Sequence, residues 1–263
     1  MGQDAYVRLA RAASLARRPG VVLIEQDLDD LIELVGSRAE AHAVVASLER
    51  QGRVRPVRRG AYALVDAGGG VRLDVLDLVA AVTAKPYLVT AGRALQFHGL
   101  SDQHYRRVFV LVSTQLRAWT WRGDEVRYVR TNRSLRGDAV RTRRTRAQIA
   151  TPERAIADSL DHPSWGVPLS QVVQAIVTAL DRDSTSADRL AVEAARADSH
   201  SLARRLGFIV SRLAGTEAAR PFLPLRGESK ASTPLRAGGP AGGPIDRIWR
   251  VRENADLERL SQH

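Results

Sequence analysis

The chain has 263 residues and no cysteine, which excludes disulfide scaffolds, cysteine zinc sites, iron–sulfur clusters and thiol catalysis. Its 40 basic residues, all but two of them arginine, outnumber 29 acidic ones and give a net charge of +11. The length predicts two domains. No apolar stretch is long enough to span a membrane, and no signal segment follows Met1, so we expect a cytoplasmic protein with no membrane partner.

The positive charge is concentrated in one part of the chain. Residues 71–150 carry 15 basic and 6 acidic side chains, whereas the segments before and after are each nearly balanced. An arginine-rich coding bias would raise arginine everywhere, but it would not deplete acids in one segment. Because a positive surplus attracts phosphate backbones, we expect nucleic acid to be the main partner.

The first 66 residues follow the order helix, strand, helix, helix, hairpin. Apolar residues recur at helical spacing over 4–18, 26–35 and 38–51, and a short apolar strand covers 21–24. Ser37 with Glu40 three residues later indicates a capping box, and Gly52 suits the helix end. Strands at 54–57 and 61–65 flank a tight turn. This order predicts an N-terminal winged helix-turn-helix.

In such a domain the second helix reads DNA bases near its N-terminus. Arg38, Ala39 and His42 lie there, off the apolar stripe, and the hairpin arginines have no acid between them. The alternative is a plain three-helix domain whose hairpin packs against the neighbouring domain of the chain. The predicted DNA-binding residues are Ser37, Arg38, Ala39, His42, Arg53, Arg55, Arg58 and Arg59.

Three glycines at 68–70 predict a linker between domains 1–66 and 71–263. In the second domain we expect helices at 71–84, 88–99 (after a short extended entry), 152–160, 168–180, 187–197, 201–213 and 255–261. Strands are expected at 107–113, 125–130, 139–146 and 245–251. The Gly/Pro/Ser-rich stretch 228–243 predicts a flexible loop. The fold class is therefore α+β, with a mixed α/β second domain.

The stretch 122–146 holds nine arginines against three acids. Trp119, Trp121 and Tyr128 lie close by in sequence and would offer stacking surfaces beside the charge, a combination that suits a polyanion. The alternative is a solvated sheet face in an arginine-biased protein. The expected polyanion face comprises Arg127, Arg130, Arg141, Arg143, Arg144 and Arg146.

Motifs that carry catalysis are absent from the sequence. It contains no metal-ligand spacing, phosphate-binding loop or nucleophile elbow, so we expect no catalytic residue, no metal and no cofactor. Arg154 and Asp158 have the spacing of a helical ion pair, and Glu153 favours the helix N-terminus. His98 before Gly99 is interpreted as a helix-end packing residue.

Four segments occur in the order found in one known family: Arg59 to Tyr62 (RGAY), Thr90 to Ser101 (TAGRALQFHGLS), Thr151 to Asp158 (TPERAIAD) and Arg204 to Phe208 (RRLGF). With them the chain resembles the AbiEi family, the antitoxins of type IV toxin–antitoxin pairs whose partner is a nucleotidyltransferase-like toxin. The resemblance implies a non-enzymatic repressor that binds the double-stranded operator of its own operon. It also implies that the C-terminal domain counteracts the toxin, for which the expected polyanion face is a candidate surface.

Two other functions remain open. One is a nucleic-acid-processing enzyme that uses the winged helix for targeting. The other is a stand-alone, ligand-responsive transcriptional regulator. An adjacent reading frame for a nucleotidyltransferase would separate the antitoxin from the stand-alone regulator.

Overall fold

The computed structural model describes residues 2–15, 20–23, 29–84, 86–136, 138–141, 146–183 and 185–261. Over these residues the fold is α+β, as the sequence predicts. Internal contacts divide the chain into two compact units. The N-terminal unit comprises Met1–Tyr87, Leu116–Arg127 and Asp138–Gln148, and the C-terminal unit comprises Leu88–Gln115, Tyr128–Gly137 and Ile149–His263.

This division does not fall at the expected linker, Gly68 to Gly70. The Asp66 carboxylate accepts hydrogen bonds from the N–H groups of Gly68 (3.0 Å) and Gly70 (2.9 Å), so the glycines form a tight turn. Beyond that turn, helix α5 (Val75–Val82) belongs to the N-terminal unit. Arg58 Nη2 donates to the Val82 carbonyl at 2.7 Å, and this bond ties the hairpin to α5.

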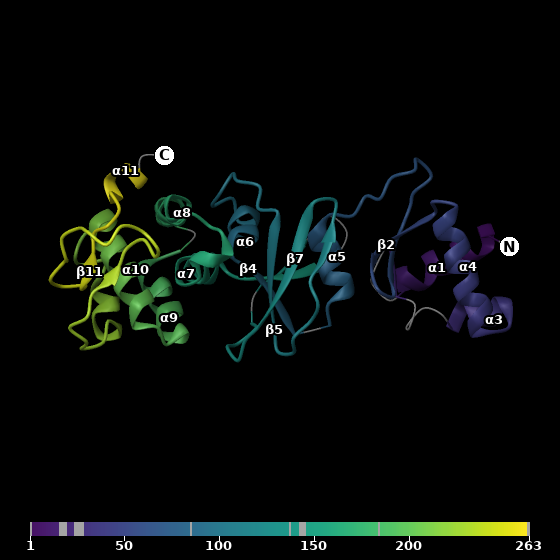
Figure 1. Ribbon diagram of the computed structural model, residues 1–263, viewed down its shortest axis with the longest axis horizontal. Helices are drawn as coiled ribbons and strands as arrows, with labels where there is room; N and C mark the ends of the chain where they lie inside the picture. Colours follow the sequence, from purple (N-terminus) through teal and green to yellow (C-terminus); the bar gives the residue numbers. More distant parts are fainter. Residues whose placement is uncertain are drawn as a thin grey trace. The chain divides into compact units, whose positions relative to one another are not determined.

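In the described residues, helices α1, α3 and α4 and a three-stranded antiparallel sheet begin the N-terminal unit (Figure 1). The helices are α1 (Gly2–Leu15), α3 (Asp29–Val35) and α4 (Arg38–Arg50), and the strands are β1 (Val21–Leu23), β2 (Val54–Arg58) and β3 (Ala61–Leu64). Their common core contains Leu9, Val22, Val45, Leu48 and Val54. Apolar burial against α4 therefore holds the hairpin and the helices together.

The strand order is β1-β3-β2, so β2 is an edge strand. Pro56 lacks a backbone N–H and cannot donate to a neighbouring strand. An edge strand tolerates this because one of its sides has no partner strand. The register shifts between Pro56, which pairs with Tyr62, and Arg58, which pairs with Ala61. This irregularity lies just before the turn at Arg59 and Gly60.

A second sheet has six strands in the order β6-β7-β5-β4-β9-β8. They are β4 (Tyr87–Thr90), β5 (Arg107–Val112), β6 (Trp119–Trp121), β7 (Asp124–Arg130), β8 (Asp138–Arg141) and β9 (Arg146–Ile149). β4 and β9 pair in parallel, with Val89 opposite Ile149. The single strand expected at 139–146 is therefore two strands, and β6 was not expected at all.

The C-terminal unit is rich in helices (Figure 1). They are α6 (Ala91–Phe97), α7 (Pro152–Asp161), α8 (Leu169–Asp181), α9 (Ala187–Ala197), α10 (His200–Ala214) and α11 (Leu257–Ser261), with 3₁₀ turns at Pro163–Trp165 and Arg220–Leu225. α7 begins as predicted, with Pro152 in its first turn and the Thr151 side chain accepting from the Arg154 N–H.

The segment after α10 differs from its prediction. Of the expected strand 245–251, only Val251 belongs to a named strand, β11 (Val251–Arg252), which pairs in parallel with β10 (Thr233–Pro234). The expected flexible loop 228–243 contains β10 and is otherwise irregular, and buried and half-buried side chains bind its backbone. Arg204 of α10 donates to three carbonyls, those of Arg226, Ser229 and Ala231, each at 2.7 Å.

Candidate nucleic-acid interface

Helix α4 begins where the sequence predicts, because Ser37 caps it. The Ser37 side chain accepts the Glu40 N–H at 3.2 Å, and its hydroxyl donates to the Glu40 carboxylate at 3.0 Å. The Glu40 carboxylate thus accepts a hydrogen bond from the serine hydroxyl. In a full capping box this carboxylate would instead accept the backbone N–H of the N-cap residue. Gly36, with φ +91°, makes the short turn from α3 into this cap.

Gly52 ends α4, also as predicted. Its φ is +69°, its N–H donates to the Glu49 carbonyl at 2.9 Å, and the next N–H, that of Arg53, donates to Leu48 at 2.9 Å. These two bonds form a Schellman motif, which needs a left-handed residue at this position. The chain therefore leaves α4 in a fixed direction and enters the hairpin at once.

The two faces of α4 have opposite character. Ala41, Val45 and Leu48 are buried in the core, as the apolar stripe predicts. Near the N-terminus of the helix, Arg38, Ala39 and His42 are exposed. The side chains of Arg38 and His42 thus lie on the solvent face of the first turns of α4.

The four hairpin arginines do not share one environment. Arg55 on β2 and Arg59 at the turn are exposed. The Arg53 guanidinium lies over the Tyr6 ring, 4.7 Å from its centre, and the Tyr6 hydroxyl donates to the Val65 carbonyl at 2.6 Å. Arg53 therefore packs against α1.

Arg58 is bonded within the N-terminal unit. Its Nη2 donates to the Val82 carbonyl, and its buried Nε has no hydrogen-bond partner. The hairpin thus bonds to α5, which belongs to the same unit, and this contact is not the packing against a neighbouring domain that the alternative expected. Arg55 and Arg59 are the hairpin residues whose guanidinium groups face solvent.

The expected polyanion face is not formed by neighbouring strands. Arg127 and Arg130 are on β7, whereas Arg141 and Arg146 are on β8 and β9, and in the sheet β7 and β8 have β5, β4 and β9 between them. Arg127 also pairs with Glu125 at 2.8 Å. Arg143, Arg144 and the Arg141 side chain lie outside the described residues. Arg127 and Arg130 therefore lie several strands away from Arg141 in the sheet, and a polyanion face made by these residues stays a prediction.

The expected stacking surfaces are also not available. Trp119 and Trp121 are each 7% exposed and Tyr128 is 6% exposed. These aromatic rings are part of the core, because alternate residues of β6 and β7 point inward. The hypothesis that they stack on nucleic-acid bases is wrong.

The Thr151 to Asp158 motif forms a buried ion network. Asp158 accepts from Arg154 Nε (2.8 Å) and the Thr90 hydroxyl (2.8 Å) on one oxygen, and from Arg133 Nη1 (3.0 Å) on the other. The predicted ion pair between Arg154 and Asp158 is confirmed. Desolvation by burial lowers the pKa of Arg133, against the opposing effect of Asp158. The network joins the start of α6 to α7.

His98 has the structural position that the sequence predicts. It is the C-cap residue of α6, and its Nε2 lies 2.7 Å from the Ala150 carbonyl. Among the described residues, no cluster of three histidine or acidic side chains is arranged to hold a metal ion. No described helix combines the length and apolar character that a membrane crossing requires.

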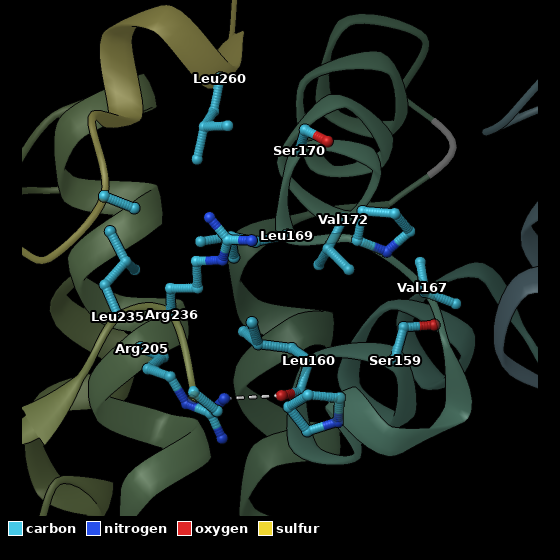
Figure 2. A pocket seen from close by; sticks show the side chains of 14 residues that line it. Ser159, Leu160, Val167, Leu169, Ser170, Val172, Arg205, Leu235, Arg236 and Leu260 are labelled. Atoms are coloured by element: carbon cyan, nitrogen blue, oxygen red, sulfur yellow. Dashed lines mark hydrogen bonds between the residues drawn. The ribbon is translucent and has the colours of Figure 1, made fainter. Parts of the chain in front are cut away.

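A cavity of about 290 Å³ in the C-terminal unit was not expected from the sequence (Figure 2). Leu160, Val172 and Leu260 line it, and the exposed Arg236 extends along it in Figure 2. The buried Arg205 forms another part of the wall and donates to the Leu160 carbonyl at 2.7 Å. The cavity is thus mostly aliphatic, with a cationic side chain that reaches solvent.

Comparison with known proteins supports the fold. The chain is similar to the crystal structure of the RV2827C protein from Mycobacterium tuberculosis, with a TM-score of 0.70 and 16% sequence identity, over 94% of this chain and 90% of that one. At this identity the likeness concerns the fold alone. No protein-family model and no curated protein sequence matches the chain, so the resemblance to AbiEi antitoxins rests on its motifs.

Proposed function

We propose that the chain is a double-stranded-DNA-binding repressor whose first residues, 1–66, form a winged helix-turn-helix. In this proposal α4 is the recognition helix and the β2–β3 hairpin is the wing. The observation that carries it is the two-faced α4: its core face is packed, while Arg38, Ala39 and His42 face solvent at the end that reads bases in such domains.

The hairpin supports the same proposal. Arg55 and Arg59 are exposed on a short ribbon. Arginines in this arrangement suit contacts with phosphate oxygens, which position the protein on DNA without reading sequence. Arg53 and Arg58 support the fold instead, because Tyr6 and the Val82 carbonyl already engage their guanidinium groups.

The biological role comes from the resemblance. We propose that the protein represses its own operon and counteracts a nucleotidyltransferase-like toxin, as AbiEi antitoxins do. All four shared segments include residues with structural roles here. These are the hairpin turn, Thr90 and His98 with their bonds to Asp158 and the Ala150 carbonyl, the Asp158 network, and the Arg204 bonds to the 226–231 backbone. The shared motifs therefore support a common scaffold, and the antitoxin activity itself is an expectation.

The test is binding to the DNA upstream of the gene, compared with a shuffled duplex of the same length, by fluorescence anisotropy. Base contacts specify, so Arg38→Ala and His42→Ala should each reduce the preference for the upstream DNA by about 1–3 kcal/mol. Arg50→Ala is the matched control, because Arg50 is exposed at the opposite end of α4. Equal losses on both duplexes for Arg38→Ala would contradict base reading by α4.

The cavity favours a second candidate, ligand-responsive regulation. Its aliphatic walls and the exposed Arg236 suit a small aliphatic carboxylate. Calorimetric titration with hexanoate and with neutral hexanamide tests it. The carboxylate should bind, Arg236→Gln should weaken it, and the complex should have altered affinity for upstream DNA. Equal binding of both compounds would contradict a role for the cation.

A further inference from the structure

A second hollow in the C-terminal unit is surrounded by cations. It measures about 630 Å³ and is formed by the segments 223–230 and 247–250. Leu223 and Ile248 line it with 38% and 48% of their surface exposed. Its basic lining residues are Arg226, Lys230, Arg247 and Arg250, against the single acidic residue Glu228. We refer to this hollow as the basic groove.

Arginine side chains hold the two segments of the basic groove to each other. Arg226 Nη1 donates to the Ile248 carbonyl, and in the opposite direction Arg250 Nε donates to the Lys230 carbonyl at 3.2 Å. Beneath the first segment, Arg204 makes its three bonds to the backbone between residues 226 and 231. The basic groove is therefore built into the fold, and binding needs little ordering of its backbone.

The basic groove keeps an excess of positive charge that no described carboxylate pairs with. Within the described parts of the chain, the ion pairs with carboxylates involve neither Arg204 nor the four basic lining residues. Burial lowers the pKa of Arg204, and the nearby charges of Arg250 and Arg226 lower it further. These guanidinium groups are thus close enough to repel one another, and an anionic partner would relieve that repulsion.

We propose that the basic groove binds an acidic segment of a partner protein, in which carboxylates alternate with aliphatic side chains. Carboxylates match the planar guanidinium fork, and Leu223 and Ile248 would cover the aliphatic side chains of the same segment. This site goes beyond the proposed DNA binding, because it uses none of the α4 or hairpin residues.

The lining distinguishes a protein segment from nucleic acid. Single-stranded nucleic acids bind through stacking on aromatic side chains. The described lining contains none, and the neighbouring Trp249 is only 4% exposed. A duplex backbone would bring its charged phosphates against Leu223 and Ile248 and leave the aliphatic surface without an apolar partner. An acidic segment that also carries leucine or valine satisfies both parts of the lining.

The experiment uses the full chain and a short fluorescein-labelled peptide of Glu-Leu-Asp repeats, with a Gln-Leu-Asn peptide as the neutral probe. Anisotropy should show binding of the acidic peptide only. Arg247→Glu and Ile248→Ser should each weaken binding by about tenfold, because they remove a cation and an aliphatic contact from the same site. Both side chains are exposed, so the fold should not change.

Arg259→Glu is the matched control, since Arg259 is exposed and does not line the basic groove. It should leave peptide binding within about twofold of wild type. No binding of the acidic peptide, or equal weakening by Arg247→Glu and Arg259→Glu, would overturn the proposal. Displacement of the peptide by single-stranded or duplex DNA, abolished by Arg247→Glu, would assign the basic groove to nucleic acid instead. Loss of DNA binding through α4 would not affect any of these results.

Discussion

The arginines of α4 and its hairpin contrast with those of α7 and α10. Arg38 and Arg59 face solvent, whereas Arg154 and Arg204 are 5% and 4% exposed. The buried pair is engaged by the Asp158 carboxylate and by three backbone carbonyls, respectively. One residue type is therefore exposed to solvent in one region and forms part of the internal architecture in the other. The number of arginines in a segment does not distinguish these two uses. The burial of each side chain and its hydrogen-bond partners do.

The difference follows from the chemistry of the guanidinium group. Its planar fork donates up to five hydrogen bonds and stays charged, so it can join several carbonyls or carboxylates at once. A buried guanidinium costs desolvation and is stable only when its partners are in place. An exposed one keeps its water and can exchange that water for phosphate oxygens.

The largest expected effect tests the buried side of this comparison. Asp158→Ala removes the acceptor shared by Arg154, Arg133 and Thr90 and leaves two cations without it. The free energy of unfolding should fall by about 3–5 kcal/mol, measured by chemical denaturation followed by circular dichroism.

The control for this variant is Arg127→Ala. It breaks the Arg127–Glu125 pair, whose side chains are 48% and 33% exposed, and should cost at most about 1 kcal/mol. A loss for Asp158→Ala as small as that of the control would show that the network contributes no more than a surface pair.

A smaller effect on stability is expected at Gly207, which lies near Arg204 and Arg205 on α10. A methyl group on Gly207 would overlap the Trp249 ring. Gly207→Ala should therefore lower the free energy of unfolding by about 1–3 kcal/mol, although alanine favours helices, because the ring must shift. Gly242→Ala is the control, since nothing lies within 4 Å of its added carbon. An equal response of the two variants would contradict close packing between α10 and Trp249.

Local signals in the sequence predicted α4 well. Ser37 with Glu40 and the terminal Gly52 each act within a few residues, so they define the helix ends without the rest of the fold. The exposure of Arg38 and His42 follows from the same helical period. This part of the candidate interface could therefore be predicted from the sequence alone.

Long-range pairing could not be predicted in the same way. The periodicity indicated β7 and β8 as strands, but nothing local shows that β5, β4 and β9 lie between them. The segment from Ile245 to Val251 was expected to be a strand. Instead, the Asp246 carboxylate accepts the N–H groups of Ile248 (2.9 Å) and Trp249 (2.7 Å) and makes a turn.

The smallest effects separate two adjacent hairpin arginines that look equivalent in the sequence. Arg59→Ala should reduce the slope of log affinity against log salt by about 0.9, the contribution of one phosphate contact, and leave stability unchanged. Arg58→Ala should leave that slope nearly unchanged. It should instead lower the free energy of unfolding by about 1–2 kcal/mol, because the carbonyl of the buried Val82 loses its donor.

Salt titrations with upstream DNA and denaturation curves for both variants provide the measurements, and Arg58→Lys is the intermediate case. Lysine keeps the positive charge but not the guanidinium fork, so it should retain the salt slope and recover only part of the stability. Suppose that Arg58→Ala removed a full phosphate contact and left stability intact. Arg58 would then leave Val82 to reach DNA, and Arg55, Arg58 and Arg59 would all be phosphate-binding candidates. If Arg58→Ala instead lowers stability and leaves the salt slope unchanged, then Arg58 supports the fold, whereas the adjacent Arg59 is free to contact DNA.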